Sequence, residues 1–134
     1  MSKKEEYRKA NEAFMASVSK KEGVVTLPDG VCYEVLAAGN GSGVVGDRSV
    51  VTCHYRGSLI DGKVFDDSWK RGCPEAFRVN ELISGFSSAL KRMHVGDHWK
   101  IYIPWELGYG KRSDGDIPGC STLVFEVQLL VIHI

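Results

Sequence analysis

A short stretch of the sequence places two aromatic rings near one carboxylate, and this combination predicts a small binding pocket. Tyr55 stands in a run in which apolar and polar residues alternate, and Phe65 and Asp66 follow after a turn. The dipeptide Asp61-Gly62 between them is typical of tight hairpins, with positive φ angles expected at both residues. A hairpin turn at this point would bring its two arms side by side. We therefore expect Tyr55, Phe65 and Asp66 to lie together.

The other reactive side chains are arranged less favourably for chemistry. His94 and His98 have a spacing that metal ligands use, but Gly96 and Asp97 between them indicate a turn, and no third ligand is evident. No motif for a catalytic nucleophile or for a phosphate-binding loop is recognisable. The absence of a CxxC pair argues against a redox motif and predicts reduced thiols at Cys32, Cys53, Cys73 and Cys120. We expect a site without a metal and without a cofactor.

The overall composition is that of an ordinary single domain. The chain has 134 residues, of which 43% are hydrophobic and 25% are charged, and its formal net charge is zero. This balance argues against electrostatic binding to nucleic acid or to an anionic membrane surface. No stretch is apolar enough to span a bilayer or to act as a signal peptide. We therefore expect a cytoplasmic location, or a periplasmic or exported one if this sequence has been trimmed from a longer precursor.

Residues 3–22 are expected to form a helix with one narrow apolar stripe, and Gly23 is a natural C-cap. The apolar residues recur at intervals of three and four positions, at Tyr7, Ala10, Phe14 and Val18. Docking onto the rest of the chain and pairing with another helix would both explain such a stripe, and we favour docking. Because isolated helices of this length are only marginally stable, we expect a monomer or a weak dimer.

The remaining pattern predicts an α+β domain built from antiparallel strands and one core helix. Alternating apolar residues mark strands on both sides of Pro28-Asp29-Gly30, around Tyr55 and at residues 99–103. In the last strand the inward-facing residues are expected to be Leu123, Phe125, Val127, Leu129 and Val131. Residues 80–93 form the widest apolar face in the chain, with Asn80 as the N-cap of a helix. We expect this helix to lie across one face of the sheet.

Four segments of the chain resemble the FKBP family of peptidyl-prolyl cis-trans isomerases, the macrolide-binding immunophilins. They occur in the family's order, as VTCHYRGSLIDGKVFDDSWKRG, ELISGFSSALKRMHVGD, IPWELGYG and IPGCSTLVFEVQLL. The helix before GVVTLPDGVCYEVL further resembles bacterial members of the macrophage-infectivity-potentiator type, with a shortened arm. The resemblance implies a bent antiparallel sheet wrapped around the helix at 80–93. It also implies a helical arm at residues 1–22 and an isomerase domain at residues 23–134.

The resemblance also implies a set of site residues, carried over position by position. Those with an expected catalytic role are Tyr55, Phe65, Asp66, Ile83, Tyr109 and Phe125. Those expected to bind substrate are Arg71, Leu82, Phe86, Glu75 and Asp116. Phe86 stands where a tryptophan commonly forms the pocket floor, Glu75 where some members have an aromatic wall, and Asp116 in a shortened loop near the rim. These departures keep an aromatic floor but predict weaker binding of macrolide inhibitors.

The implied activity is isomerisation of the peptide bond before proline, and the implied partners are proline-containing polypeptides. An apolar pocket would favour the twisted amide over the planar one. The alternative is a non-catalytic proline-peptide-binding or chaperone module that uses the same pocket. Aromatic residues on strands are commonly just core, so it is the set of matching segments that favours the enzyme. No nucleic acid or membrane partner is expected.

Overall fold

The computed structural model describes residues 2–133, which form short strands and helices. The strands are β1 (Val24–Thr26), β2 (Cys32–Ala37), β3 (Val50–Ser58), β4 (Val64–Asp67), β5 (Glu75–Arg78), β6 (His98–Ile103) and β7 (Leu123–His133). The helices are α1 (Lys3–Ser19), α2 (Ser68–Arg71) and α3 (Ser84–Leu90), with 3₁₀ turns η1 (Val79–Glu81) and η2 (Trp105–Leu107). None of the helices in the described part of the chain is long and apolar enough to cross a membrane.

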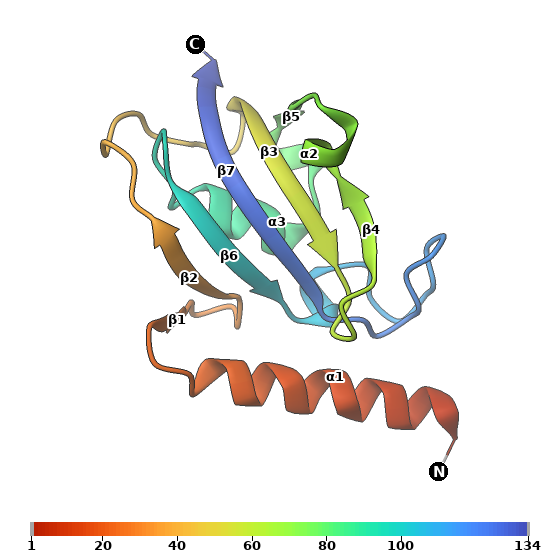
Figure 1. Ribbon diagram of the computed structural model, residues 1–134. Coiled ribbons are helices and arrows are strands. Elements are labelled where there is room, and N and C mark those ends of the chain that lie inside the picture. Colours follow the sequence, from red (N-terminus) through yellow and green to blue (C-terminus); the bar gives the residue numbers. More distant parts are fainter. Residues whose placement is uncertain (1, 134) are drawn as a thin grey trace.

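The strands pair antiparallel in one sheet. Their order is β1-β2-β6-β7-β3-β4, and β5 pairs with the first half of β3. Figure 1 shows α3 behind this sheet and α1 running along its lower end. The predicted α+β class, with an antiparallel sheet packed around one core helix, is confirmed.

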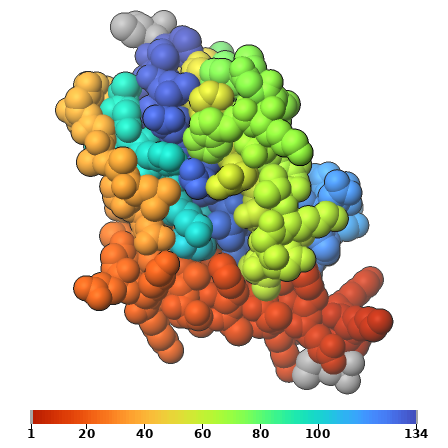
Figure 2. Space-filling model, viewed as in Figure 1, coloured from red at the N-terminus to blue at the C-terminus, as the bar shows by residue number. Residues whose placement is uncertain are grey.

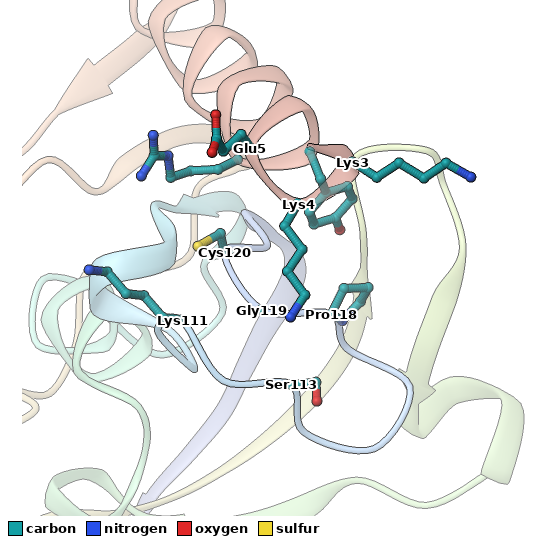
Figure 3. A pocket seen from close by; sticks show the side chains of 10 residues that line it. Lys3, Lys4, Glu5, Lys111, Ser113, Pro118, Gly119 and Cys120 are labelled. Carbon is teal, nitrogen blue, oxygen red and sulfur yellow. The ribbon is translucent and has the colours of Figure 1, made fainter. Parts of the chain in front are cut away.

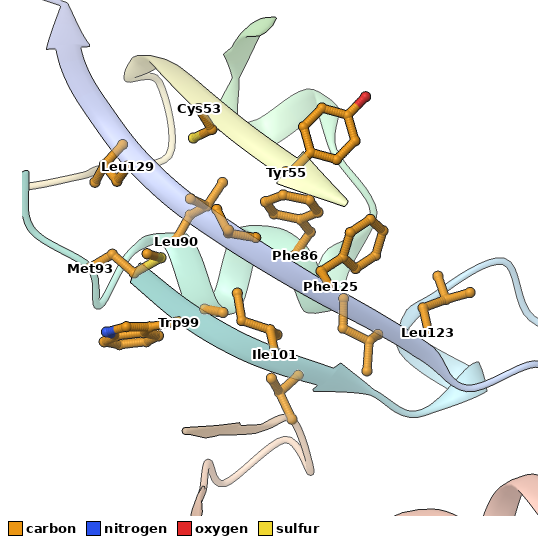
Figure 4. Packing of buried hydrophobic residues seen from close by; sticks show 14 of the residues in the cluster. Cys53, Tyr55, Phe86, Leu90, Met93, Trp99, Ile101, Leu123, Phe125 and Leu129 are labelled. Carbon is orange, nitrogen blue, oxygen red and sulfur yellow. The ribbon is translucent and has the colours of Figure 1, made fainter. Parts of the chain in front are cut away.

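The hydrophobic core lies between the inward face of the sheet and α3. On β3, Val51, Cys53 and Tyr55 are buried, and the residues between them point to the opposite face. Cys53 is a free thiol, and burial raises its pKa to about 12. On β7 the buried positions are Leu123, Phe125, Val127 and Leu129. These side chains belong to one core cluster with the apolar residues of α3, and Figure 4 shows Cys53, Tyr55, Phe125 and Leu129 among them. The predicted alternation therefore holds along the centre of both strands.

The prediction that Val131 faces the core is wrong, because β7 contains a bulge. Thr52 pairs with Val131, but the next residue of β3 pairs with Leu129, so Leu130 is an extra residue. One extra residue reverses the direction of the side chains beyond it. Val131 is accordingly 44% exposed, and Ile132 packs against the core in its place.

The helix predicted to begin at Asn80 begins later and is shorter. Asn80 lies in η1, and its backbone N–H donates to the backbone oxygen of Asp47 at 2.9 Å. Leu82 and Ile83 are extended, and α3 begins only after them, without a side-chain cap. The buried residues of this segment are Phe86, Ala89, Leu90 and Met93. The helix therefore lies across the sheet as predicted, although its first turn is replaced by extended chain.

The amino-terminal helix is also shorter than predicted and buries a polar residue. α1 ends at Ser19, and Gly23, with a φ angle of +85°, lies in the following turn and not at the cap. Ala10 is exposed, whereas Asn11 is fully buried. The Asn11 side-chain oxygen accepts the backbone N–H of Thr122 at 2.8 Å. This bond joins α1 to the residues just before β7, so the helix docks within the chain.

Further contacts along α1 support this docking. The Tyr7 hydroxyl shares a hydrogen bond of 2.7 Å with the Ser121 hydroxyl. The Phe14 ring lies 6.1 Å from the Tyr102 ring, and Val18 is 7% exposed. Figure 2 shows α1 as a ridge along the bottom of the molecule, in contact with the strands above it. The apolar stripe of α1 is therefore docked onto the rest of the chain, which is the explanation that we favoured.

The hairpin between β3 and β4 turns where it was predicted, but with a different backbone. Gly62 has a positive φ angle of +90°, and Asp61 does not. The Gly62 N–H donates to the Leu59 oxygen at 2.9 Å, and the Asp61 carboxylate accepts the Lys63 N–H at 2.9 Å. The turn is therefore wider than a two-residue loop with two positive φ angles, and it still brings both arms together.

Candidate active site

A pocket of about 310 Å³ opens between the inward face of the sheet, the start of α3 and the loop after η2. A volume of this order is typical of sites for small ligands. The residues that line it are Tyr55, Phe65, Asp66, Phe77, Glu81, Leu82, Ile83, Phe86, Tyr109 and Phe125. All six residues with an expected catalytic role therefore come together, joined by Leu82 and Phe86 from the expected substrate-binding set.

Aromatic rings form the floor of this pocket. The Phe86 and Phe125 ring centroids lie 4.8 Å apart, and Phe65 meets Phe125 edge-on at 5.7 Å. Tyr55 meets Phe77 edge-on at 5.4 Å. Phe86 and Phe125 are each 4% exposed, so they belong to the core as well as to the pocket, as Figure 4 shows. Tilted and edge-on contacts of this kind stabilise the rings in one arrangement and give a firm apolar surface.

One carboxylate stands beside the floor and is held by two donors. The Tyr55 hydroxyl donates to one oxygen of Asp66, and Arg71 Nη1 donates to the other. Arg71 Nη2 also donates to Glu75 Oε1 at 3.0 Å. Arg71 and Glu75 do not line the pocket themselves. Arg71 therefore holds Asp66 from outside the pocket lining, and Glu75 contacts Arg71.

Tyr55 and Asp66, together with Arg71 outside the lining, form a polar wall of the pocket, and their contacts set its protonation. Burial acts to raise the pKa of Asp66, but the hydrogen bonds from Tyr55 and Arg71 outweigh it and hold that pKa below its ordinary value. Burial, followed by the hydrogen bond to Asp66, raises the pKa of Tyr55 to about 12. The hydrogen bonds with Tyr55 and Asp66 raise the pKa of Arg71. At neutral pH the wall therefore contains a carboxylate, a neutral phenol and a guanidinium cation.

The lowered pKa of Asp66 predicts that stability depends on acid pH. A carboxyl group with a lowered folded-state pKa stabilises the fold above its ordinary pKa of 3.8, and this contribution is lost as pH falls through the folded-state value. We expect the free energy of unfolding, measured by urea denaturation, to decline below about pH 4. Asp66→Asn should remove part of that decline, whereas Asp61→Asn at the exposed hairpin tip should not. The same decline in Asp66→Asn and in the unmodified chain would contradict this prediction.

Two hydrogen-bond donors at the pocket have no partner inside the described part of the chain. The backbone N–H of Ile83 donates to no acceptor among residues 2–133, because the chain is extended here and α3 has not begun. The Tyr109 hydroxyl likewise has no hydrogen bond within these residues, and its side chain is 39% exposed. Burial, followed by the charges of Asp114 and Asp66, raises the pKa of Tyr109 and keeps it protonated. Both donors can therefore bind carbonyl groups of a ligand.

Two lining residues were not predicted, and three predicted residues, Arg71, Glu75 and Asp116, do not line the pocket. Phe77 on β5 and Glu81 in η1 line the pocket. Phe77 follows Glu75 by two positions on one strand, so strand alternation offered a signal for it. No local pattern marks Glu81. Asp116 is exposed and does not line the pocket, and Asp114 is the loop carboxylate that acts on the nearby tyrosine.

Comparisons with known proteins agree with this geometry. A family model described as FKBP-type peptidyl-prolyl cis-trans isomerase matches residues 42–130, and one for the domain amino terminal to that isomerase matches residues 1–35. The FKBP-type 22 kDa peptidyl-prolyl cis-trans isomerase of Escherichia coli is 46% identical over 120 residues, which cover 89% of this chain and 58% of that protein. The outer membrane protein MIP of Legionella longbeachae is 39% identical over 131 residues, which cover 97% of this chain and 56% of that protein.

A solved structure extends the likeness over the full length of the chain. The peptidyl-prolyl cis-trans isomerase of Pseudomonas syringae pv. tomato matches with a TM-score of 0.90 and 36% sequence identity. The match covers 100% of this chain and 98% of that one. By contrast, the chain spans little more than half the length of the two curated relatives, 58% and 56%.

Proposed function

Because the chain belongs to the family of FKBP-type peptidyl-prolyl cis-trans isomerases, we propose that it accelerates rotation about X-Pro peptide bonds in polypeptides. The observation that carries the proposal is the pocket itself. An aromatic floor lies there beside two donors, the Ile83 N–H and the Tyr109 hydroxyl, that no group in the described residues uses. Proline is an apolar ring flanked by peptide carbonyls, so the pocket matches its chemistry on both sides.

Such a pocket would act on the barrier to rotation. Resonance between the amide nitrogen and the carbonyl group makes this barrier about 18–20 kcal/mol. In the twisted transition state this conjugation is lost, so charge separation across the amide falls. An apolar surface therefore binds the twisted amide more favourably than the planar one, which water solvates better. The step needs no nucleophile and no transferred proton.

The pocket residues divide between an apolar and a polar task. We expect the proline ring to pack on Phe86 and Phe125, with the edge of Phe65 closing one side. The Ile83 N–H and the Tyr109 hydroxyl would each donate a hydrogen bond to a carbonyl oxygen of the substrate, which holds the peptide while the bond turns. Binding energy from the neighbouring peptide is then available to favour the twisted form.

Asp66 has a different task in this proposal. Both of its oxygens already accept hydrogen bonds from the chain, one from Tyr55 and one from Arg71. It therefore keeps the polar wall in shape and holds the Tyr55 ring against the floor. Its negative charge also stands close to the twisting amide, where it disfavours the approach of a second anionic group.

A proline-limited refolding assay tests the proposed function. We expect the chain to accelerate the slow phase of a protein whose refolding waits for X-Pro isomerisation. The acceleration should be unchanged by a chelator, because no metal takes part in the proposed step. Loss of activity with the chelator would contradict that mechanism. No acceleration in either condition would favour a non-catalytic module that binds proline-containing peptides.

Removal of the Tyr109 hydroxyl should lower activity and leave stability unchanged. Since one hydrogen bond contributes about 0.5–1.5 kcal/mol, Tyr109→Phe should reduce kcat/KM by about 2- to 12-fold. Tyr7→Phe is a matched control, because it removes a hydroxyl that bonds to Ser121 at 2.7 Å on the docked helix. It should affect stability and spare turnover. Unchanged kcat/KM in Tyr109→Phe would remove this hydroxyl from the mechanism.

We propose that residues 1–22 serve as an arm on an isomerase domain at 23–134 and that the chain is a monomer or a weak dimer. The apolar side chains of α1 are used inside the chain, with Val18 7% exposed and Phe14 against Tyr102. The apolar residues that α1 fully exposes are small, namely Ala10, Ala13 and Ala16, so they offer a second helix only short side chains to bury. Sedimentation at micromolar concentration should give a monomer mass, or a mass that rises with concentration. A dimer mass independent of concentration would contradict this prediction.

The same pocket is the proposed site for macrolide inhibitors. Their affinity should be reduced, because a phenylalanine at position 86 offers a smaller floor than tryptophan. Glu75 engages Arg71 at 3.0 Å in place of an aromatic wall. The location stays a prediction, cytoplasmic or, for a sequence trimmed from a longer precursor, periplasmic or exported.

A further inference from the structure

A second cavity, larger than the pocket, lies between the start of α1 and the loop before β7. This arm–loop cleft has a volume of about 640 Å³, against about 310 Å³ for the pocket. It is lined from α1 by Lys3, Lys4, Glu5, Tyr7 and Arg8 and from the loop by Lys111, Ser113, Pro118, Gly119 and Cys120. Figure 3 shows the helix on one side of the cleft and the loop on the other. The proposed isomerase mechanism does not use it.

The arm–loop cleft concentrates positive charge in a chain whose formal net charge is zero. Lys3, Lys4, Arg8 and Lys111 line it, against the single carboxylate of Glu5. Within residues 2–133, none of these four cations forms a salt bridge. In Figure 3, Lys4 reaches from the helix toward the loop, and Lys111 extends from the loop below the helix. Cations gathered around a hollow without partners favour a ligand that brings negative charge.

Arg8 has hydrogen-bonding capacity that the described residues do not use. The side chain is half-buried, and its Nε is buried without a hydrogen-bond partner in this part of the chain. A buried donor without an acceptor costs free energy. A carboxylate entering the cleft would bring two acceptors to the guanidinium, in the geometry that arginine binds best.

Apolar surface in the same cleft favours a peptide over a small anion as the ligand. The Tyr7 ring, Pro118 and Cys120 form this surface. A phosphate ion would leave it in contact with water, whereas a peptide with an apolar side chain would cover it. Nucleic acid is disfavoured, because its backbone is bound through a longer track of phosphate contacts than one cleft supplies.

We propose that the arm–loop cleft binds a short acidic segment of another polypeptide. Its carboxylates would contact Arg8 and the lysines, and one apolar side chain would pack between Tyr7 and Pro118. The proposal stands apart from isomerase activity, because the cleft and the pocket are separate cavities. They nevertheless share a loop. The backbone N–H of Cys120 donates to the oxygen of Gly110 at 2.8 Å, next to Tyr109.

Fluorescence anisotropy with two labelled peptides tests this proposal on the unmodified chain. The probe is fluorescein-Glu-Glu-Leu-Phe-Glu-Glu-amide, and the control peptide has Gln at every Glu. Neither contains proline, so neither requires the isomerase pocket. We expect the acidic probe to bind at least about tenfold more tightly than its control and to be released by added salt. Equal binding of the two peptides would overturn the proposal, whatever the refolding assay gives.

Two matched pairs of substitutions locate the binding. Lys4→Glu with Lys111→Glu reverses two charges in the cleft, and Lys9→Glu with Lys63→Glu makes the same change at exposed positions outside it. We expect the first pair to weaken binding of the acidic probe at least about tenfold and the second less than about twofold. Equal effects would overturn the assignment to the cleft. Displacement of the probe by an equal concentration of inorganic phosphate would overturn the peptide ligand and indicate a small-anion site.

Discussion

Replacing Phe125 with alanine is expected to lower the free energy of unfolding by about 3–5 kcal/mol. The ring is 4% exposed and lies 4.8 Å from the Phe86 ring and 5.7 Å from the Phe65 ring. Truncation removes these contacts and leaves a cavity. Strands β3 and β7 are paired along their length on either side of this position, so the backbone cannot collapse to fill it. A loss of this size is a large share of the stability of one domain.

Urea denaturation checks this prediction, and Phe65→Ala is the matched control. Phe65 is only partly buried, so its truncation should cost less stability while removing the neighbouring part of the proline-binding floor. We expect every folded variant of either kind to lose isomerase activity, and Phe125→Ala to lose more stability than Phe65→Ala. A loss below about 1 kcal/mol for Phe125→Ala would contradict its place in the core.

The centre of the pocket could be predicted because the strand pattern is local. Tyr55 and Phe125 are members of alternating apolar series on β3 and β7, and both are buried. The hairpin dipeptide indicates which strand lies beside β3, and this placed Phe65 and Asp66 next to Tyr55. The expected roles of these residues came from the family resemblance of the surrounding segments, because alternation alone is equally compatible with an ordinary core.

The start of α3 could not be predicted in the same way. Leu82 and Ile83 continue the apolar spacing of a helix, so the sequence favours one continuous helix from Asn80. The bond from the Asn80 N–H to the oxygen of Asp47 instead ties this segment to a distant loop, and the chain stays extended up to α3. This break leaves the Ile83 N–H without a partner among the described residues. A donor for substrate therefore depends on the feature that the local pattern missed.

Two other differences also come from contacts between distant parts of the chain. Asn11 interrupts the apolar stripe of α1, yet it is buried because Thr122 provides a donor for its side-chain oxygen. Val131 faces outward because the register between β3 and β7 shifts at the adjacent bulge. Neither the partner of a buried amide nor the position of a bulge is encoded in the hydrophobic periodicity of one segment.

Gly57 is a further position that the alternating pattern leaves unexplained, and Gly57→Ala is expected to disable the pocket. Gly57 faces inward on β3. A Cβ atom added there would lie 2.6 Å from Phe65 Cζ and 2.7 Å from Phe125 Cε1. Carbon atoms at these distances repel one another strongly. Gly57 is paired with Asp66 on one side and Phe125 on the other, so the backbone has little freedom to move away.

The two rings that meet the new methyl group are not equally free to move. Phe125 is held in the core, whereas Phe65 is partly buried and meets it edge-on, so we expect Phe65 to turn outward. Overpacking of this kind should cost about 1–3 kcal/mol of stability. The proline ring would lose one side of its binding surface, and kcat/KM should fall by about 10- to 100-fold.

Gly46→Ala is the matched control for this substitution. A Cβ atom there would have its nearest neighbour at 3.8 Å, and the residue does not need a positive φ angle. Urea denaturation and kcat/KM measured on the same preparations separate lost stability from a lost pocket. Adding Phe65→Leu to Gly57→Ala removes the Phe65 ring atoms near the methyl group and leaves Phe125 Cε1 at 2.7 Å, so it should restore part of the stability without restoring turnover. Full turnover in Gly57→Ala at unchanged stability would show that proline binding does not require Phe65 and Phe125 to keep their present contact.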